Sequence, residues 1–172
     1  MNSSAEPRAI VFVGPMGAGK TSVGKRVARG LRLPFIDTDR VIVQANGPIP
    51  AIFAEHGEGH FRAIERAAVA DALGSGAVVS LGGGAVLDPD TRADLAAHRV
   101  VYLTVSPGTV ASRIRDANRP LVAGDDPVGA WERIFAERRP LYEEVADVTF
   151  DTSCGPIAHV ATAVLDWLKA DA

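Results

Sequence analysis

The fold class of this chain is decided by the stretch Gly14-Pro-Met-Gly-Ala-Gly-Lys-Thr21. It follows Ala9-Ile-Val-Phe-Val13, a short β-branched run that is typical of a buried strand. It precedes Val23, Val27 and Leu31, whose spacing predicts one face of a helix. Glycines in such a loop let the backbone wrap closely around phosphate oxygens, because a Cβ would clash there. The order of strand, loop and helix therefore predicts a phosphate-binding P-loop.

The loop also predicts how a nucleotide is held. Backbone amides at a helix N-terminus favour an anion, and here they belong to Gly17, Ala18, Gly19, Lys20, Thr21 and Ser22. Lys20 adds a full positive charge, and the Thr21 hydroxyl is suited to ligate magnesium. We therefore predict ATP and Mg²⁺ as cofactors. The alternative is a glycine-rich turn that merely caps a helix, but such a turn does not explain Lys-Thr at its end.

Further apolar runs and amphipathic stretches alternate along the chain. Strands are expected at residues 34–37, 77–81, 100–105 and 148–151. Helices are expected at 39–45, at about 58–72, after Pro89, from about 107 to 115, around Trp131 and at 157–168, with Pro140 kinking or breaking the helix that contains Trp131. Such alternation implies right-handed crossovers, hence an α/β fold in three layers with a five-stranded parallel sheet and helices on both faces.

Length and composition limit the class of protein. The chain has 172 residues, of which 47% are hydrophobic and 23% charged, as expected of one globular domain spanning 1–172 with a core at about 9–169. A single cysteine, Cys154, excludes an intrachain disulfide and a Cys-based zinc site. The net charge of −3 argues against a nucleic-acid partner. No apolar run approaches the ~20 residues of a membrane helix, so we expect a cytoplasmic protein. We also expect a monomer, and we disfavour a domain of a larger multifunctional enzyme.

Six motifs, in order along the chain, carry a resemblance to a known family. They are Gly14-Pro-Met-Gly-Ala-Gly-Lys-Thr-Ser-Val-Gly24, Phe35-Ile-Asp-Thr-Asp39, Phe61-Arg-Ala-Ile-Glu65, Leu81-Gly-Gly-Gly84, Arg119-Pro-Leu121 and Arg138-Arg-Pro-Leu-Tyr142. With them the chain resembles the shikimate kinases over residues 10–152. The resemblance implies a P-loop fold like that of nucleoside monophosphate kinases. It also implies transfer of the γ-phosphate of ATP to the 3-hydroxyl of shikimate, a step in aromatic amino-acid biosynthesis.

Two aspartates gain roles from this resemblance. Asp37 and Asp39 follow the second strand, and carboxyl ends of parallel strands are where such folds place ligands. The resemblance assigns Asp37, with Thr21, to the magnesium shell. It assigns Asp39 to the substrate hydroxyls and, with Lys20, to catalysis. The alternative is helix capping, since Asp39 precedes a helix, although capping explains only one of the two aspartates.

The resemblance also implies a pocket for the shikimate carboxylate. Arg62 and Arg138 would hold it, because a guanidinium grips a carboxylate with two parallel hydrogen bonds. The backbone of three consecutive glycines would form part of the same pocket: Gly82, Gly83 and Gly84. Without the family frame, Arg62 reads as an exposed helix charge paired with Glu58 or Glu65. The glycines then read as a tight turn, and Arg139 competes with Arg138.

The remaining assignments concern the rim of the site. The resemblance implies substrate-binding helices at about 38–73 and a closing lid at about 115–127. Arg119 would act from the lid as a catalytic and ATP-binding residue, where the alternative is a solvated charge. Arg113 is expected to stack on adenine. Gly47-Pro-Ile-Pro50 departs from the Gly-x-Ser-Ile of the family, and we expect no ligand contact there.

Two other functions fit parts of the pattern. A kinase of the same fold acting on gluconate is the nearer one, since fold alone does not separate acceptors. A catalytically silent ATP-binding protein is the second, and the joint presence of Lys20, Thr21, Asp37 and Arg119 argues against it. A GTPase is disfavoured because the chain lacks a guanine-reading Asn-Lys-x-Asp stretch.

Overall fold

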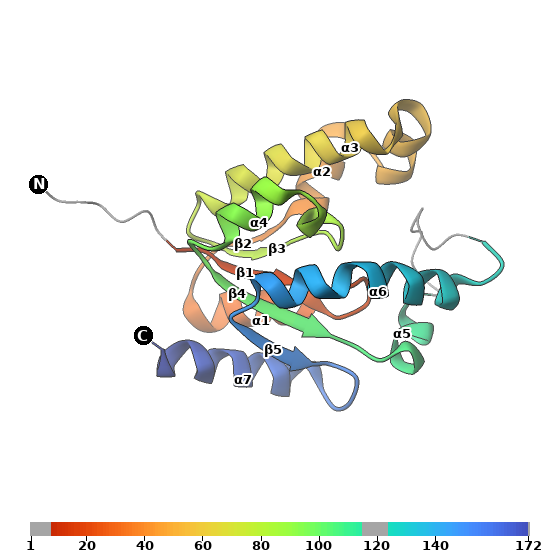
Figure 1. Ribbon diagram of the computed structural model, residues 1–172. Coiled ribbons are helices and arrows are strands. Elements are labelled where there is room, and N and C mark those ends of the chain that lie inside the picture. The colour runs from red at the N-terminus through yellow and green to blue at the C-terminus, as the bar shows by residue number, and fades with distance from the viewer. Residues whose placement is uncertain (1–7, 115–123, 172) are drawn as a thin grey trace, which may run out of the picture.

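The computed structural model describes residues 8–114 and 124–171, and its centre is a parallel sheet (Figure 1). The strands are β1 Ile10–Val13, β2 Phe35–Asp37, β3 Val78–Ser80, β4 Arg99–Thr104 and β5 Val148–Asp151. Their order is β2-β3-β1-β4-β5, and each neighbouring pair is parallel. The five-stranded parallel sheet expected from the sequence is thus confirmed.

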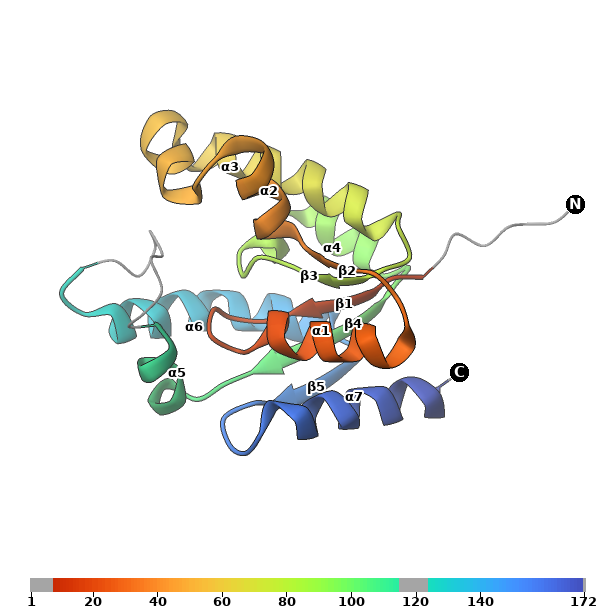
Figure 2. The same ribbon diagram turned by 180° about the vertical axis from the view of Figure 1, so that it is seen from behind.

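Helices cover both faces of this sheet. They are α1 Lys20–Leu31, α2 Thr38–Asn46, α3 Ile49–Leu73, the 3₁₀ turn η1 Ala85–Leu87, α4 Pro89–Leu95, α5 Pro107–Ile114, α6 Pro127–Val145 and α7 Ile157–Ala170. Figure 2 shows α1 and α7 in front of the sheet, while α3, α4 and α6 lie on the other side, as Figure 1 shows. The three-layer α/β/α architecture is confirmed.

The two faces of β1 explain why the sheet is buried on both sides. Side chains alternate along a strand, so Ile10 and Phe12 point to one face and Val11 and Val13 to the other. The first pair packs in the core cluster that contains α1 and α7. The second pair packs in the cluster formed with α3, α4 and Tyr142 of α6. An unbroken apolar run is what such a doubly covered strand requires.

The start of α3 differs from the expectation. We expected a helix from Glu58, but α3 begins at Ile49, with Pro48 at its N-cap. Pro50 lies in the first turn, where the missing amide has no helical acceptor to lose and the fixed φ suits the helix. Gly57 interrupts the helix with a φ of 83°, so the stretch that was recognised from its periodicity is the part that follows this kink.

Of the kink or break expected at Pro140, the break does not occur, because Pro140 lies inside α6. The helix continues through it to Val145. Proline removes one hydrogen bond within the helix, but Trp131 and Tyr142 are buried on either side of it and hold both halves against the core.

Among the residues that the structure describes, no helix is both long enough and apolar enough to cross a bilayer.

Candidate active site

The P-loop leaves β1 at the middle of the sheet. Gly14 has a φ of 142°, and a Cβ on it would lie 2.1 Å from the backbone oxygen of Leu103 in β4. No other residue fits there, because neither the backbone conformation nor a strand carbonyl can yield. Gly19, with a φ of 86°, is the N-cap of α1 and brings the chain into the helix at Lys20. The amides of the first turn therefore point into the loop.

Lys20 lies against the loop that it follows. Its Nζ donates to the carbonyl oxygens of Gly14 at 2.8 Å and of Pro15 at 3.0 Å. The ammonium group is thereby held at the mouth of the loop. This is the position from which a positive charge reaches phosphate oxygens bound by the amides.

Thr21 and Asp37 meet beside the loop. The Thr21 hydroxyl donates to Oδ2 of Asp37 at 2.8 Å. Magnesium binds hard oxygen ligands and keeps several waters, so one hydroxyl and one carboxylate provide a fitting site. Asp37 also caps α2, because its side chain accepts from the amide of Arg40 at 3.3 Å. The capping aspartate is therefore Asp37, and the expectation that placed Asp39 ahead of the helix is corrected: Asp39 lies in the first turn.

Asp39 faces the glycine triplet. A Cβ on Gly82 would lie 2.6 Å from Oδ1 of Asp39 and 3.0 Å from Oε2 of Glu65. Thr38 joins the same two segments, since its Oγ1 donates to the carbonyl of Ser80 and accepts from the amide of Gly82, each at 3.3 Å. Thus β2 and β3 bring the aspartate and the triplet together at their carboxyl ends.

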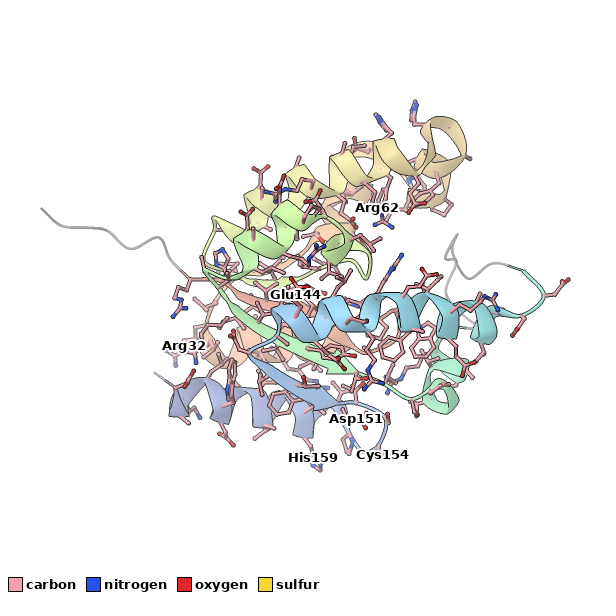
Figure 3. The ribbon with its side chains drawn as sticks, viewed as in Figure 1. Arg32, Arg62, Glu144, Asp151, Cys154 and His159 are labelled. Atoms are coloured by element: carbon pink, nitrogen blue, oxygen red, sulfur yellow. The ribbon has the colours of Figure 1, made fainter. Side chains whose placement is uncertain are left out.

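Arg62 projects from α3 on the side that faces α6 (Figure 3). Its Nη1 donates to Glu65 at 2.7 Å and its Nη2 to Glu58 at 3.2 Å, so the helix pairing considered in the sequence does form. Yet the side chain is only 21% exposed. A Cβ on Gly84 would lie 2.4 Å from its Nη1. Arg62 is thus both a helix ion pair and a wall of the cavity.

Glu65 is a site residue that reasoning on the sequence did not single out. It is 3% exposed and lies between Arg62 and Asp39. Burial raises the pKa of its carboxyl, whereas the neighbouring Arg62 acts in the opposite direction. The signal in the sequence is its place at the end of the Phe61-Arg-Ala-Ile-Glu65 motif.

Arg138 reaches the middle glycine from α6. A Cβ on Gly83 would lie 3.7 Å from its Nη1 and 3.5 Å from the hydroxyl of Tyr142. Arg139, the competing candidate, instead pairs with Glu143 at 2.8 Å on the exposed side of the helix. The two arginines chosen from the sequence, Arg62 and Arg138, therefore lie beside neighbouring glycines of one triplet.

We expect Gly84→Ala to raise KM for the acceptor substrate by about tenfold while KM for ATP changes by less than about twofold. Gly84 has an ordinary helical φ and ψ, so alanine leaves the backbone unstrained but occupies the space of the Arg62 guanidinium. Steady-state kinetics with each substrate varied in turn measure this. Gly59→Ala is the control, because a Cβ there meets nothing within 4 Å. An unchanged KM for the acceptor would show that Arg62 is not needed in its present place.

Arg113 bridges the P-loop and the segment that follows β5. Its Nη1 donates to the Gly17 carbonyl at 2.7 Å, and its Nη2 to the Thr152 carbonyl at 3.0 Å. The side chain thus lies next to the nucleotide loop. Its stacking on adenine stays a prediction. Arg119 and most of the expected lid lie outside the described residues.

One cavity of about 680 Å³, a size that suits small-molecule ligands, is lined by the glycine triplet and by Lys20, Thr21, Asp37, Asp39, Arg62, Glu65 and Arg138. Arg113 does not line this cavity. The apolar wall of the cavity was not foreseen: it is formed by Pro48, Ile49, Pro50, Phe53, Phe61, Trp131, Ile134 and Phe135. Three of the four residues Gly47–Pro50 line the cavity, and the expectation that no ligand contacts them stays a prediction. The helical periodicity of α3 and α6 marked some of these side chains only as core.

A P-loop at the switch point of a parallel sheet, with a hydroxyl–carboxylate pair and two arginines in one cavity, defines a P-loop kinase of small molecules. Comparison with known proteins then identifies the family. The family model described as shikimate kinase matches residues 16–169. The shikimate kinase of Stenotrophomonas maltophilia is 48% identical over 171 residues, which are 94% of this chain and 95% of that protein. This chain belongs to the shikimate kinase family.

Solved structures agree with this assignment. The shikimate kinase from Acinetobacter baumannii in complex with shikimate has a TM-score of 0.91 and 34% identity, covering 97% of this chain and 96% of the other. A gluconokinase from Sinorhizobium meliloti has a TM-score of 0.62 at 24% identity, with 96% and 95% covered, and shares the fold. The chain is accordingly an ATP-dependent kinase whose cofactors are ATP and Mg²⁺.

Proposed function

We propose that this chain transfers the γ-phosphate of ATP to the 3-hydroxyl of shikimate. The observation that carries the proposal is the pair Arg62 and Arg138 beside Gly84 and Gly83, next to a P-loop in the same cavity. Two guanidinium groups at that spot suit a small acid with a carboxylate. The relative from Acinetobacter baumannii was solved with shikimate bound, which supports the same acceptor here.

The residues divide the work between binding and transfer. Arg62 and Arg138 hold the carboxylate, and the triplet lets the ring approach the backbone. Asp39, at the other end of the triplet, orients the reacting hydroxyl and accepts its proton. Lys20 and the loop amides stabilise charge on the phosphoryl group. Thr21 and Asp37 would hold magnesium, which would neutralise part of the phosphate charge. Since phosphoryl transfer depends mainly on positioning and charge, a strong base is not required.

ADP production in a coupled assay tests the function. With ATP and Mg²⁺ present, we expect shikimate to stimulate ADP release strongly and gluconate to leave it near the background. If gluconate stimulated ADP release and shikimate did not, the acceptor would be gluconate and the proposal would be wrong. Nucleotide binding without transfer to either acid would favour a silent ATP-binding protein.

The proposal also covers the domain organisation, oligomeric state and location of the protein. We infer a single kinase domain that acts as a monomer in the cytoplasm. The net charge of −3 supports a small-molecule partner rather than a nucleic acid. Light scattering during gel filtration at assay concentration measures the mass, and a value twice that of the chain would contradict the monomer.

A further inference from the structure

One face of helix α6 contacts both the nucleotide loop and the glycine triplet of the active site. Trp131, Phe135, Arg138 and Tyr142 are spaced by four, three and four residues, which places them on one side of the helix. All four line the cavity. Arg138 has a role in the proposed function, whereas the two buried residues at the ends of this face, Trp131 and Tyr142, have none.

Trp131 reaches the nucleotide loop. Its indole Nε1 donates to the backbone carbonyl of Met16 at 2.8 Å, and the residue is 2% exposed. Met16 lies inside the P-loop, two residues after Gly14. Tryptophan has one polar atom, a donor, so this contact uses its entire hydrogen-bonding capacity. A carbonyl bound in this way cannot turn into the loop, where the amides must face phosphate.

Tyr142 reaches the glycine triplet. Its hydroxyl donates to the carbonyl of Gly83 at 2.5 Å, and the residue is 1% exposed. Its ring stacks on Tyr102 with 5.4 Å between centroids, which fixes the direction of the hydroxyl. Burial raises the pKa of Tyr142, so the hydroxyl remains a donor throughout the physiological range. The peptide that follows Gly83 is the one that leads to Gly84, against which Arg62 lies.

We propose that Trp131 and Tyr142 are positioning residues through which α6 aligns the two substrates. Trp131 fixes the P-loop by holding the carbonyl of Met16. Tyr142 fixes the acceptor pocket by holding the carbonyl of Gly83. A Cβ on Gly83 would lie 3.6 Å from the carbonyl oxygen of the P-loop residue Gly14 and 3.7 Å from Nη1 of Arg138, so this glycine lies close to both. Both donor side chains are buried and both acceptors belong to partly buried residues of the cavity wall, so removing a donor leaves its carbonyl without the side chain that holds it in place. The assignment rests on the proposed function only for the identity of the acceptor.

Two substitutions separate the two hydrogen bonds. Trp131→Phe should raise KM for ATP and the Kd for ADP about tenfold and leave KM for shikimate within about twofold. Tyr142→Phe should do the reverse, with KM for shikimate about tenfold higher and the ADP affinity within about twofold of the wild type. Both variants keep an aromatic ring, so the loss is mainly that of one donor.

The chain provides a matched control for each variant. Tyr102→Phe removes a buried tyrosine hydroxyl from the ring that stacks on Tyr142, and that hydroxyl donates to no backbone carbonyl of the described chain. Trp167→Phe removes an indole from α7, where the ring packs under Arg99 and lines no part of the cavity. Both controls should retain wild-type KM values for the two substrates.

The outcomes decide the proposal without ambiguity. The proposal is supported if Trp131→Phe raises only KM for ATP and Tyr142→Phe raises only KM for shikimate. Equal changes in both KM values, or no change in either, overturn it. A variant that fails to fold while its control folds also overturns it, because the hydrogen bond then serves stability instead. If the wild type does not phosphorylate shikimate, the proposed acceptor fails, yet the effect of Trp131→Phe on ADP affinity still tests the nucleotide half.

Discussion

Replacing Lys20 by alanine is expected to lower kcat by about a thousandfold, with both substrates saturating, because a preorganised charge that acts on the transferring group is lost. The ammonium group lies 2.8 Å and 3.0 Å from two carbonyls of the P-loop, so its place at the mouth of the loop is set before nucleotide arrives. Single-turnover measurements with radiolabelled ATP would detect the small remaining rate.

Lys25→Ala provides the control for this experiment. Lys25 lies on the same helix, is exposed, and does not line the main cavity, so its loss should leave turnover unchanged. The unfolding midpoint of each variant shows whether the loop still folds. Near-normal turnover of a folded Lys20→Ala protein would contradict the role of this lysine in phosphoryl transfer.

Arg62→Ala is expected to weaken shikimate binding by about 10- to 100-fold, since charge-assisted hydrogen bonds are each worth about 1.5–3 kcal/mol. ATP affinity should change little, because Arg62 contacts Gly84 and two glutamates rather than the P-loop. Titration calorimetry with each ligand measures both affinities.

The loss of Arg62 also leaves the buried Glu65 without its partner, so stability must be followed in parallel. Arg66→Ala is the control on the same helix. Arg66 pairs with Asp94 at 2.6 Å and does not line the cavity. The Arg66→Ala substitution therefore removes an ion pair but no ligand contact. An equal loss of affinity for both ligands in folded Arg62→Ala would refute the assignment of the pocket.

The sheet and the P-loop were predictable because their signals are local. A P-loop is predicted from two features alone, the β-branched run before Gly14 and the lysine and threonine after Gly19. Each feature acts through backbone and side-chain chemistry within a few residues. The strand limits from the sequence agree closely with those of the structure; β2, for example, is Phe35–Asp37 where residues 34–37 were expected.

The parts of the site that were missed depend on contacts between distant segments. Trp131 donates to a carbonyl 115 residues earlier in the chain, and nothing near it in sequence distinguishes it from a core residue. Glu65 reads as one more helix charge until the fold buries it. Pro50 reads as a helix breaker, although in the first turn it is compatible with the helix. The roles of Asp39, Arg62 and Arg138 stay predictions, although the structure brings all three into one cavity.

The cavity lies at only one of the two rims of the sheet, the one where the strands have their carboxyl ends. Every ligand-facing loop described above leaves a strand at its carboxyl end, whereas the turns that enter the strands, such as 74–77 and 96–98, contribute nothing to the cavity. The fold thus separates a chemical rim from a connecting rim, as is common when parallel strands all point one way. Labels for fluorescence, surface immobilisation or fused domains therefore belong on the connecting rim, where they leave the entry of both substrates unobstructed.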